Sequence, residues 1–322
     1  MSQLLESPAR DVTHFLQSEA WARFQRARGR TVVEDAGEGW RWMAILEHGR
    51  FGSRLYVPYG PVVTRENAYA DAAASLIHHG RNVGAMYVRV EPIGVVTREE
   101  VLAFGGRRTQ QVQPSLTNRV DLRSDWDAIV GRMSQQTRRA ATQFDRRGIR
   151  VRASDDPGEI EVLLGFLDEV SHRTSMRLHP RSYLSAQAHT FLPRGDGKLY
   201  IAELDRTPIA AALFYDDPVR RYYAHAGAAG TFRSLNAGTA ILATAMRDAK
   251  DKGLSELDLY GVSPQALTDH PWAGFSRFKR TFGGSDVVYL GAWEHTVRPS
   301  ADRLRRIGAS ARALVRHVPS AR

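Results

Sequence analysis

Apolar side chains recur along this chain with two periods. Alternation of apolar and polar residues, the pattern of half-buried strands, predicts strands at residues 40–47, 54–57, 85–90, 198–203, 208–215, 221–225 and 256–260. Apolar residues three and four positions apart predict helices at residues 15–29, 68–79, 125–147, 158–171, 238–252 and 299–318. Each half of the chain thus has a helix, a meander of strands, a second helix and a further strand. We predict the α+β class, with mixed central sheets flanked by helices.

The helix predicted at residues 15–29 shows how this pattern assigns side chains. Ser18 suits its N-terminal cap, because a serine hydroxyl accepts a hydrogen bond from a free backbone N–H group. Trp21 and Phe24 lie three positions apart and are predicted to face inward. The exposed residues are predicted to be Gln17, Gln25, Arg26 and Arg28.

The helix predicted at residues 299–318 has one apolar stripe, and arginines cover much of its remaining surface. Two interpretations stay open. The stripe packs on the first domain, as in most globular proteins, or the helix lies at the surface of an anionic membrane.

Residues 271–284, PWAGFSRFKRTFGG, mix aromatic, cationic and glycine residues more densely than an ordinary surface loop. Phe275, Phe278 and Phe282 stand at positions i, i+3 and i+7, so a short helix would bury all three. The glycine pair that closes the segment permits positive φ angles. A cation of this segment would then be held against a rigid apolar surface.

Length and charge narrow the class of protein. A chain of 322 residues is expected to form two domains. The net charge of +10 favours a polyanionic partner, such as nucleic acid, a phosphorylated substrate or an anionic membrane. The absence of cysteine excludes disulfides, thiolate metal sites and a cysteine nucleophile. No apolar run approaches the length needed to cross a bilayer, and residues 1–11 lack the apolar core of a signal peptide, so we expect a cytoplasmic protein.

Several segments are similar to one known family. Residues 271–284 resemble the FKxxFGG-type signature of the Fem family, the non-ribosomal aminoacyltransferases that build peptidoglycan bridges. Residues 15–29 resemble its opening Gln-x-x-x-aromatic helix, and residues 56–63, YVPYGPVV, resemble its tyrosine-x-x-x-Gly-Pro segment. Further matches in order and spacing are Gln113-Pro114-x-x-Thr117, Val120-Asp121-Leu122 and Arg138-Arg139.

The resemblance implies a fold and an activity. It implies two tandem domains of the GNAT (acyl-CoA N-acyltransferase) type: residues 1–128 completed by 292–322, and residues 129–291. It also implies transfer of an amino acid from aminoacyl-tRNA to the side-chain amine of a stem peptide, on a UDP-linked or lipid-linked muropeptide. The chain resembles the compact type, because it has no room for the long helical arm of some members. We expect a monomer that contacts the inner membrane surface only peripherally.

The resemblance also implies roles for residues. Lys279 would stabilise developing negative charge or the 3′ end of the tRNA, and Glu91, or alternatively Asp258, would orient or deprotonate the amine. The muropeptide would be held through its phosphates or along the channel by Arg173, Gln25, Arg26, Tyr183, Tyr223, Tyr260 and Asp258. The tRNA would be held by Arg277, Arg280, Arg138 and Arg139. Gln25 stands where the family has a lysine, and this departure leaves the exact acceptor open.

Residues 233–238, RSLNAG, bear on the acyl donor. Acetyl-CoA enzymes of this fold hold a diphosphate with Gln/Arg-x-x-Gly-x-Gly/Ala at the start of a helix. Asn236 stands where the first glycine should be, and its side chain obstructs the close approach of a diphosphate to the backbone. The segment therefore argues against coenzyme A, and no cofactor or metal is expected.

The expected chemistry needs no enzyme-bound intermediate, because the aminoacyl ester of a tRNA is already activated. Making the acceptor amine neutral at pH 7 costs about 4.6 kcal/mol, so a nearby base or desolvation is expected to contribute. Two alternatives stay open. One is a tRNA-dependent transferase acting on a small peptide or secondary metabolite. The other is an inactive, basic protein that binds RNA or membranes, favoured by the seven arginines between Arg132 and Arg152.

Overall fold

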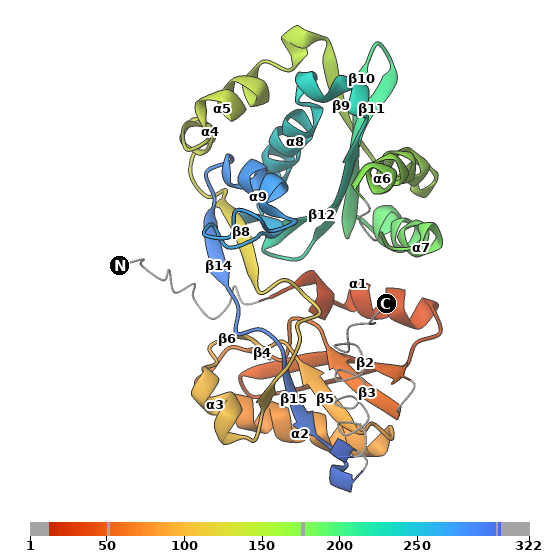
Figure 1. Cartoon of the computed structure of the whole chain (residues 1–322), viewed down its shortest axis with the longest axis vertical. Helices are drawn as coiled ribbons and strands as arrows, with labels where there is room; N and C mark the ends of the chain where they lie inside the picture. Colours follow the sequence, from red (N-terminus) through yellow and green to blue (C-terminus); the bar gives the residue numbers. More distant parts are fainter. Residues whose placement is uncertain (1–12, 50–51, 175–177, 301, 304–322) are drawn as a thin grey trace, which may run out of the picture. The chain divides into compact units, whose positions relative to one another are not determined.

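A computed structural model describes residues 13–49, 52–174, 178–300 and 302–303. Most of the helix predicted at residues 299–318 lies outside these ranges. The contacts between residues divide the chain into two units, which are coloured along the sequence in Figure 1. Unit 1 comprises residues 1–113 and 289–322, and unit 2 comprises residues 114–288.

Unit 1 is built on a mixed sheet in which the strand order is β6-β4-β2-β3-β5-β15-β7, with β1 paired to β2. Its strands are β1 (Val32–Gly37), β2 (Trp40–Gly49), β3 (Gly52–Val57), β4 (Val62–Val63), β5 (Tyr87–Val90), β6 (Ile93–Gly94), β7 (Arg107–Arg108) and β15 (Trp293–Thr296). Its helices are η2 (Phe15–Gln17), α1 (Glu19–Ala27), α2 (Tyr69–Asn82) and α3 (Arg98–Ala103). Strand β15 follows unit 2 in the sequence and pairs with β5 and β7, so it completes the sheet of unit 1.

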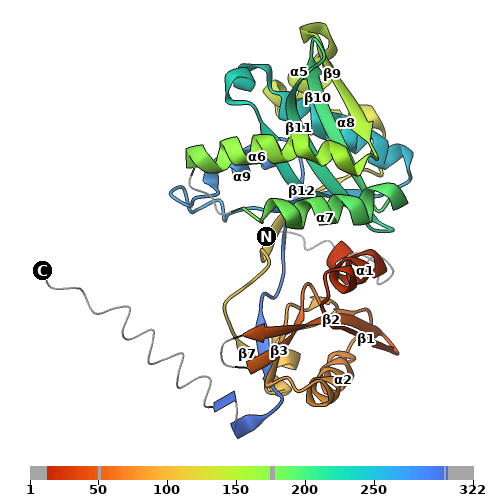
Figure 2. The same ribbon diagram turned by 90° about the vertical axis from the view of Figure 1, so that its right-hand side faces the viewer.

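Unit 2 has a second mixed sheet, ordered β14-β8-β13-β12-β11-β10-β9. Its strands are β8 (Leu116–Asp121), β9 (Ile149–Ser154), β10 (Gly197–Leu204), β11 (Thr207–Asp216), β12 (Arg220–Ala228), β13 (Glu256–Gly261) and β14 (Ser285–Val288). Its helices are α4 (Trp126–Gly131), α5 (Gln135–Thr142), η3 (Asp145–Arg147), η4 (Pro157–Glu159), α6 (Ile160–Thr174), α7 (Arg181–Phe191), η5 (Leu192–Arg194), η6 (Gly230–Leu235), α8 (Ala237–Asp251) and α9 (Ala273–Arg280). Helices α6 and α7 cover one face of the sheet, whereas α8 lies on the other (Figures 1 and 2). The predicted α+β class with mixed sheets flanked by helices is confirmed.

Helix α1 begins and packs as its sequence predicts, except that two glutamines predicted to be exposed are not. Gln17, just before the helix, is half-buried, and its side-chain nitrogen donates a hydrogen bond of 3.0 Å to the Met43 carbonyl oxygen. The Ser18 hydroxyl accepts a hydrogen bond of 3.2 Å from the Trp21 backbone N–H, and Trp21 and Phe24 are buried. Gln25 was predicted to be exposed, but it is buried. It lies four residues after Trp21 and therefore on the same inward face.

The single helix predicted at residues 125–147 is wrong. The chain forms α4, breaks, and resumes as α5, which is followed by the short helix η3. Ser134 caps the new helix, because its hydroxyl accepts a hydrogen bond of 3.3 Å from the Thr137 backbone N–H. Gly131 and Ser134 are the signals that an apolar period alone overlooks.

Strands β12 and β13 are parallel, but they remain paired over only a short distance. Their register runs from Arg220 opposite Glu256 to Tyr222 opposite Asp258, and no pair follows among the described residues. Beyond this point β13 bulges against β8, and Tyr260 takes a positive φ of 62°. The two strands therefore separate within the sheet of unit 2, and the candidate site lies where they do so.

Candidate functional site

The segment that carries Lys279 is fixed by its glycines and by one phenylalanine. Phe282 is fully buried. A Cβ atom on Gly283, which has a φ of 78°, would lie 2.6 Å from the Arg132 carbonyl oxygen. A Cβ atom on Gly284 would lie 2.4 Å from the side-chain oxygen of Asn118. The glycine pair is therefore required because helix α9 ends directly against α4 and β8.

Helix α9 buries the side chain of Lys279, where the sequence predicted buried phenylalanine rings. The sequence predicted that Phe275, Phe278 and Phe282 are buried together, but Phe275 and Phe278 are only half-buried. Helix α9 ends at Arg280, so Phe282 does not share its helical face. Lys279 is only 9% exposed, and its ammonium nitrogen lies 5.0 Å from the Phe275 ring centroid.

The Lys279 ammonium lies between the separated strands. It donates a hydrogen bond of 2.8 Å to the Gly261 carbonyl oxygen at the end of β13, and it is 6.0 Å from the ring centroid of Tyr223 on β12. Burial lowers the pKa of Lys279 to about 8, although the charge of Asp258 acts in the opposite direction. At pH 7 the site therefore holds a desolvated positive charge.

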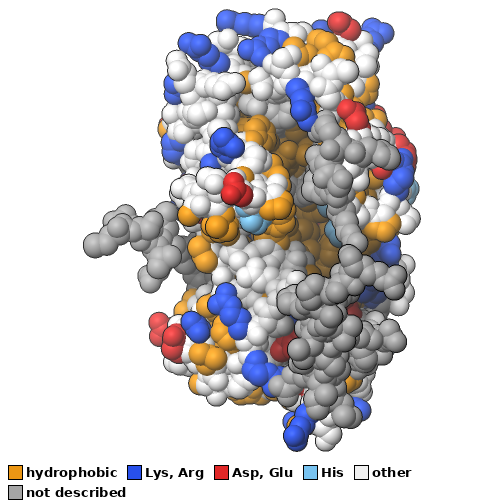
Figure 3. All heavy atoms as spheres, in the orientation of Figure 1, with side chains coloured by type: hydrophobic (Ala, Val, Ile, Leu, Met, Phe, Trp, Pro, Cys, Tyr) orange, Lys and Arg blue, Asp and Glu red, His pale blue; other side chains and the backbone are white. Residues whose placement is uncertain are grey.

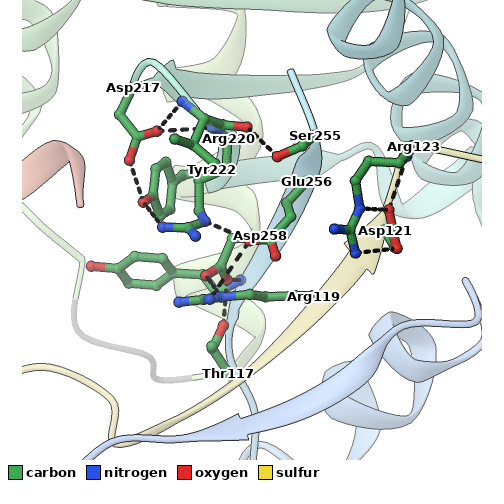
Figure 4. A network of polar contacts seen from close by, with 12 residues as sticks. Thr117, Arg119, Asp121, Arg123, Asp217, Arg220, Tyr222, Ser255, Glu256 and Asp258 are labelled. Atoms are coloured by element: carbon green, nitrogen blue, oxygen red, sulfur yellow. Dashed lines mark hydrogen bonds and ion pairs between the residues drawn. The ribbon is translucent and has the colours of Figure 1, made fainter. Parts of the chain in front are cut away.

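Asp258 joins this site to a network of charges across the sheet (Figure 4). Its carboxylate accepts hydrogen bonds from the Thr117 hydroxyl, from Arg119 Nε at 3.1 Å and from the Tyr260 backbone N–H at 2.7 Å. Arg119 also lies 3.6 Å from Glu256, which pairs with the buried Arg220. Cations and carboxylates thus alternate across β8, β13 and β12 along the paired residues. Such a network fixes the place where the strands separate.

A cavity of about 230 Å³ shares the Tyr223 ring with the Lys279 site. Its wall is mostly apolar and includes Phe278 of α9 and Ile241 of α8. Arg233 of η6 and Gly238 in the first turn of α8 also line it. Unit 2 therefore offers an acyl-sized space beside a buried ammonium group.

Comparisons with known proteins bear on the fold that carries this site. Residues 131–280 match the family model described as "Acetyltransferase (GNAT) domain", which supports the prediction of a transferase enzyme. The solved structure of FemX is similar with a TM-score of 0.79 and 13% identity, and the match covers 94% of this chain and 98% of that one. The chain has a FemX-like fold.

Two further structures share parts of this FemX-like fold. The C-terminal domain (DUF2156) of a protein from Agrobacterium fabrum, assigned as a lysylphosphatidylglycerol synthetase, matches with a TM-score of 0.57, 15% identity and 94% coverage of both chains. A tandem GNAT protein from the clavulanic acid biosynthesis pathway, solved without AcCoA, matches with a TM-score of 0.53 and 12% identity, covering 88% of this chain and 90% of that one. These matches confirm the predicted tandem GNAT architecture. A search of curated proteins finds no match.

Glu91 is the predicted catalytic carboxylate of unit 1. It is buried, and its carboxylate accepts hydrogen bonds from the Tyr56 hydroxyl at 2.8 Å and from the backbone N–H groups of Val112 and Gln113, both at 2.9 Å. These contacts alone account for its burial. Its predicted role in catalysis stays a prediction.

The residues predicted to hold substrate phosphates differ in surroundings. Arg26 is exposed on α1 and forms an ion pair with Glu34. The buried Gln25 accepts hydrogen bonds through its backbone oxygen from Arg28 and Arg30, both at 3.1 Å. The Arg173 backbone belongs to the last turn of α6, and its side chain lies outside the description.

The remaining predicted residues lie in unit 2. Tyr183 is on α7, where its ring centroid is 4.8 Å from that of His179. Arg280 is held by Asp286 at 2.7 Å and by the Ser263 carbonyl oxygen at 2.6 Å, so the ion pair already accounts for its position. Arg277 on the same helix is exposed.

Arg138 and Arg139 lie on α5. The Arg138 guanidinium donates a hydrogen bond of 3.3 Å to the Gly131 carbonyl oxygen, whereas Arg139 lines a second cavity. Sequence reasoning missed Thr117, Arg119 and Arg220 as parts of the site, because nothing in their spacing shows that three strands place them together.

Two other kinds of feature are absent from the described ranges. No helix there is long and apolar enough to cross a membrane. No group of three or more His, Asp or Glu residues there could hold a metal ion.

Proposed function

We propose that the protein is an aminoacyltransferase that takes an amino acid from aminoacyl-tRNA and transfers it to the side-chain amine of a peptidoglycan precursor. The observation that carries the proposal is the buried Lys279 ammonium, held between two separated strands beside an apolar cavity, in a chain with a FemX-like fold. A cation fixed in a dry site is suited to stabilise negative charge that develops during acyl transfer.

The reaction is a direct displacement. The acceptor amine attacks the ester carbonyl carbon of the charged tRNA, and a C–N bond forms. The carbonyl oxygen becomes negatively charged, and the C–O bond to the terminal ribose then breaks. The amine loses one proton, and the ribose oxygen gains one as it leaves, so no external oxidant, metal or cofactor is needed.

Lys279 has the donors for this task. An ammonium group has three N–H donors, and Gly261 uses one of them. The others are available to the oxygen of the tetrahedral intermediate. Because burial already lowers the pKa of Lys279 to about 8, approach of an oxyanion replaces missing solvation and is favoured more strongly than in water.

The 230 Å³ cavity would receive the aminoacyl group, since Tyr223 and Phe278 give it an apolar wall next to Lys279. Exposed cations of unit 2, including Arg277 and Arg139, would contact the tRNA backbone. Arg26 and Arg173, with Gln25, are proposed from the family resemblance to hold the phosphates of the muropeptide. Tyr183 and Tyr260 are proposed to line its path. Such an acceptor is met in the cytoplasm or at the inner face of the plasma membrane, where we place the protein.

A mass measurement tests the proposal. The protein is incubated with a mixture of charged tRNAs and UDP-linked muropentapeptide, and the products are weighed. We expect a mass increase equal to one aminoacyl residue on the peptide, which depends on charging of the tRNA. An unchanged peptide, with the tRNA mixture still charged at the end, would contradict the proposed reaction.

The second candidate acceptor is a phospholipid. It is favoured by the similarity in fold to the Agrobacterium fabrum protein, whose assigned product, lysylphosphatidylglycerol, is an aminoacylated lipid. The same incubation with phosphatidylglycerol vesicles in place of the muropeptide distinguishes the two. Aminoacylated lipid without aminoacylated peptide would decide for the lipid.

A further inference from the structure

Unit 2 contains a second, polar cavity of about 390 Å³. It lies among three segments: the first turns of α5, the short helix η3 and the segment that leads into α8. The polar residues that line it are Gln135, Gln136, Arg139, Arg147, Ser234 and Asn236. No aspartate or glutamate is among its lining residues, so its charge is positive.

The arginines of this cavity differ from Arg132 and Arg152 of the same run. Arg152 is paired with both Glu159 and Glu203, and Arg132 donates a hydrogen bond of 2.8 Å to the Asp121 carbonyl oxygen. Arg139 and Arg147 form neither an ion pair nor a side-chain hydrogen bond with the residues that the structure describes. Two guanidinium groups that face a polar cavity without a counter-charge provide a site for an anion.

Figure 3 shows Lys and Arg side chains gathered over this part of unit 2, around α5 and the segment that follows it. The break between α4 and α5 contributes to the site, because α5 begins at Gln135 and presents Gln135 and Gln136 to the cavity. One continuous helix would have no such end here. The cavity is thus a product of the local fold as well as of a basic composition.

Neighbouring residues of the chain line the two cavities of unit 2. Arg233 and Gly238 line the apolar cavity beside the Lys279 site, whereas Ser234 and Asn236, from the same segment, line the polar one. A ligand with an acyl end and a phosphate nearby could therefore occupy both. The charged 3′ strand of an RNA has this form, with an aminoacyl ester at its end and phosphodiesters along its backbone.

A diphosphate fits less well. Asn236 lines the polar cavity with a side chain at the position where acyl-CoA enzymes have the first glycine of their diphosphate loop. The backbone is therefore shielded, and side chains supply the donors. Arginine and amide side chains around an open space suit the phosphates of a flexible backbone.

We propose that this polar cavity binds a backbone phosphate of the 3′ strand of the acyl-donor RNA. The inference rests on the proposed function for the identity of the donor. It adds Arg147, Gln135 and Gln136 to the residues that hold that donor, and it gives Arg139 a defined contact.

Binding of RNA to the full chain tests this without any acyl transfer. The variants are Arg139→Gln with Arg147→Gln, and the charge-retaining pair Arg139→Lys with Arg147→Lys. The control is Arg150→Gln, which removes one exposed charge of the same run that does not line the cavity. The probes are an RNA hairpin that ends in a single-stranded ACCA, the same hairpin without these four nucleotides, and acetyl-CoA. Thermal unfolding confirms that each variant is folded.

We expect the Gln pair to weaken binding of the complete hairpin by about tenfold or more. The slope of log affinity against log salt should fall by roughly 0.7–0.9, because the contact with one phosphate contributes about that much. The Lys pair should recover most of the affinity. Arg150→Gln should change affinity by less than about threefold. For the hairpin without ACCA, wild type and the Gln pair should bind alike.

Three results would overturn the proposal: equal losses for the Gln pair and the control, an equal loss with the shortened hairpin, or acetyl-CoA binding that the Gln pair abolishes while RNA binding is kept. These outcomes are independent of the acceptor. If the muropeptide is not aminoacylated but RNA binding behaves as expected, the proposed function fails and this inference stands. If the muropeptide is aminoacylated but RNA binding does not behave as expected, the proposed function stands and the proposal for the polar cavity fails.

Discussion

The ammonium nitrogen of Lys279 donates a hydrogen bond of 2.8 Å to the carbonyl oxygen of Gly261, a residue 18 positions earlier in the chain. A carbonyl group orients the cation without cancelling its charge. The nearby Arg119 and Arg220 are instead paired with Asp258 and Glu256. No carboxylate within the described part of the chain forms an ion pair with Lys279, so its charge is kept for another group.

Replacement of Lys279 should slow the transfer reaction while the protein remains folded. We expect Lys279→Met to lower kcat for transfer by about 10²–10³-fold, because one preorganised donor to the oxyanion is lost. Arg277→Met, on the exposed side of the same helix, should raise KM for tRNA and leave kcat nearly unchanged. Steady-state rates over a range of charged-tRNA concentrations measure both kcat and KM. A Lys279→Met enzyme within tenfold of wild type would remove the lysine from the mechanism.

Stability should depend on pH through the same residue. The folded pKa of Lys279 is about 8, against 10.5 for a free lysine, so the unfolded chain binds more protons between these values. The free energy of unfolding of wild type, relative to Lys279→Met, should therefore rise by about 3 kcal/mol as pH increases from 8 to 10.5. Below pH 8 the full cost of burying the charge is present, and the methionine variant should be the more stable. Urea unfolding of both proteins at pH 7.5 and 10 measures the difference, and a pH-independent difference would show that the ammonium is not desolvated.

The glycine pair that follows helix α9 allows a prediction about the free energy of unfolding. Gly283→Ala should lower the free energy of unfolding by about 1–3 kcal/mol, because a positive φ is combined with a clash against the Arg132 carbonyl. Gly274→Ala is the matched control, since no atom lies within 4 Å of its new Cβ and it belongs to helix α9. It should stabilise by about 0.5–1 kcal/mol. Thermal unfolding compares the two; equal effects would mean that the close approach of α9 to Arg132 is not maintained in solution.

Glu91 offers a test of a role predicted from sequence. Its three hydrogen bonds favour a structural role, so we expect Glu91→Gln to reduce the free energy of unfolding by about 1–3 kcal/mol. Transfer by the folded variant should stay within about fivefold of wild type. Unchanged stability with a loss of kcat beyond 100-fold would instead assign the carboxylate to the acceptor amine.

The sequence predicted more of the fold than of the candidate site. Periodicity located most strands and helices, and the resemblance of residues 271–284 to the Fem signature pointed to Lys279. The sequence did not predict that Lys279 is a side chain that this segment buries. The apolar period favoured Phe275 and Phe278, whereas the end of α9 at Arg280 and the glycine contacts turn Lys279 inward.

Other parts of the site depend on contacts between distant segments. Gln25 faces inward because helical geometry outweighs its polarity, and Ser134 interrupts a helix that its neighbours would continue. The polar cavity joins residues about 90 to 100 positions apart, so no local pattern could show that Arg139 and Asn236 line it together. Charge composition indicated an anionic partner, but only the tertiary structure distinguishes paired from unpaired arginines.

The place where β12 and β13 separate lies within one unit, and this has a consequence for the effect of substitutions. Lys279, the strands around it, the charge network and both cavities all come from residues 114–288. In the proposed reaction, handling of the activated donor is therefore confined to one compact unit. Substitutions elsewhere in the chain would then change the acceptor without altering the residues proposed to act on the acyl group.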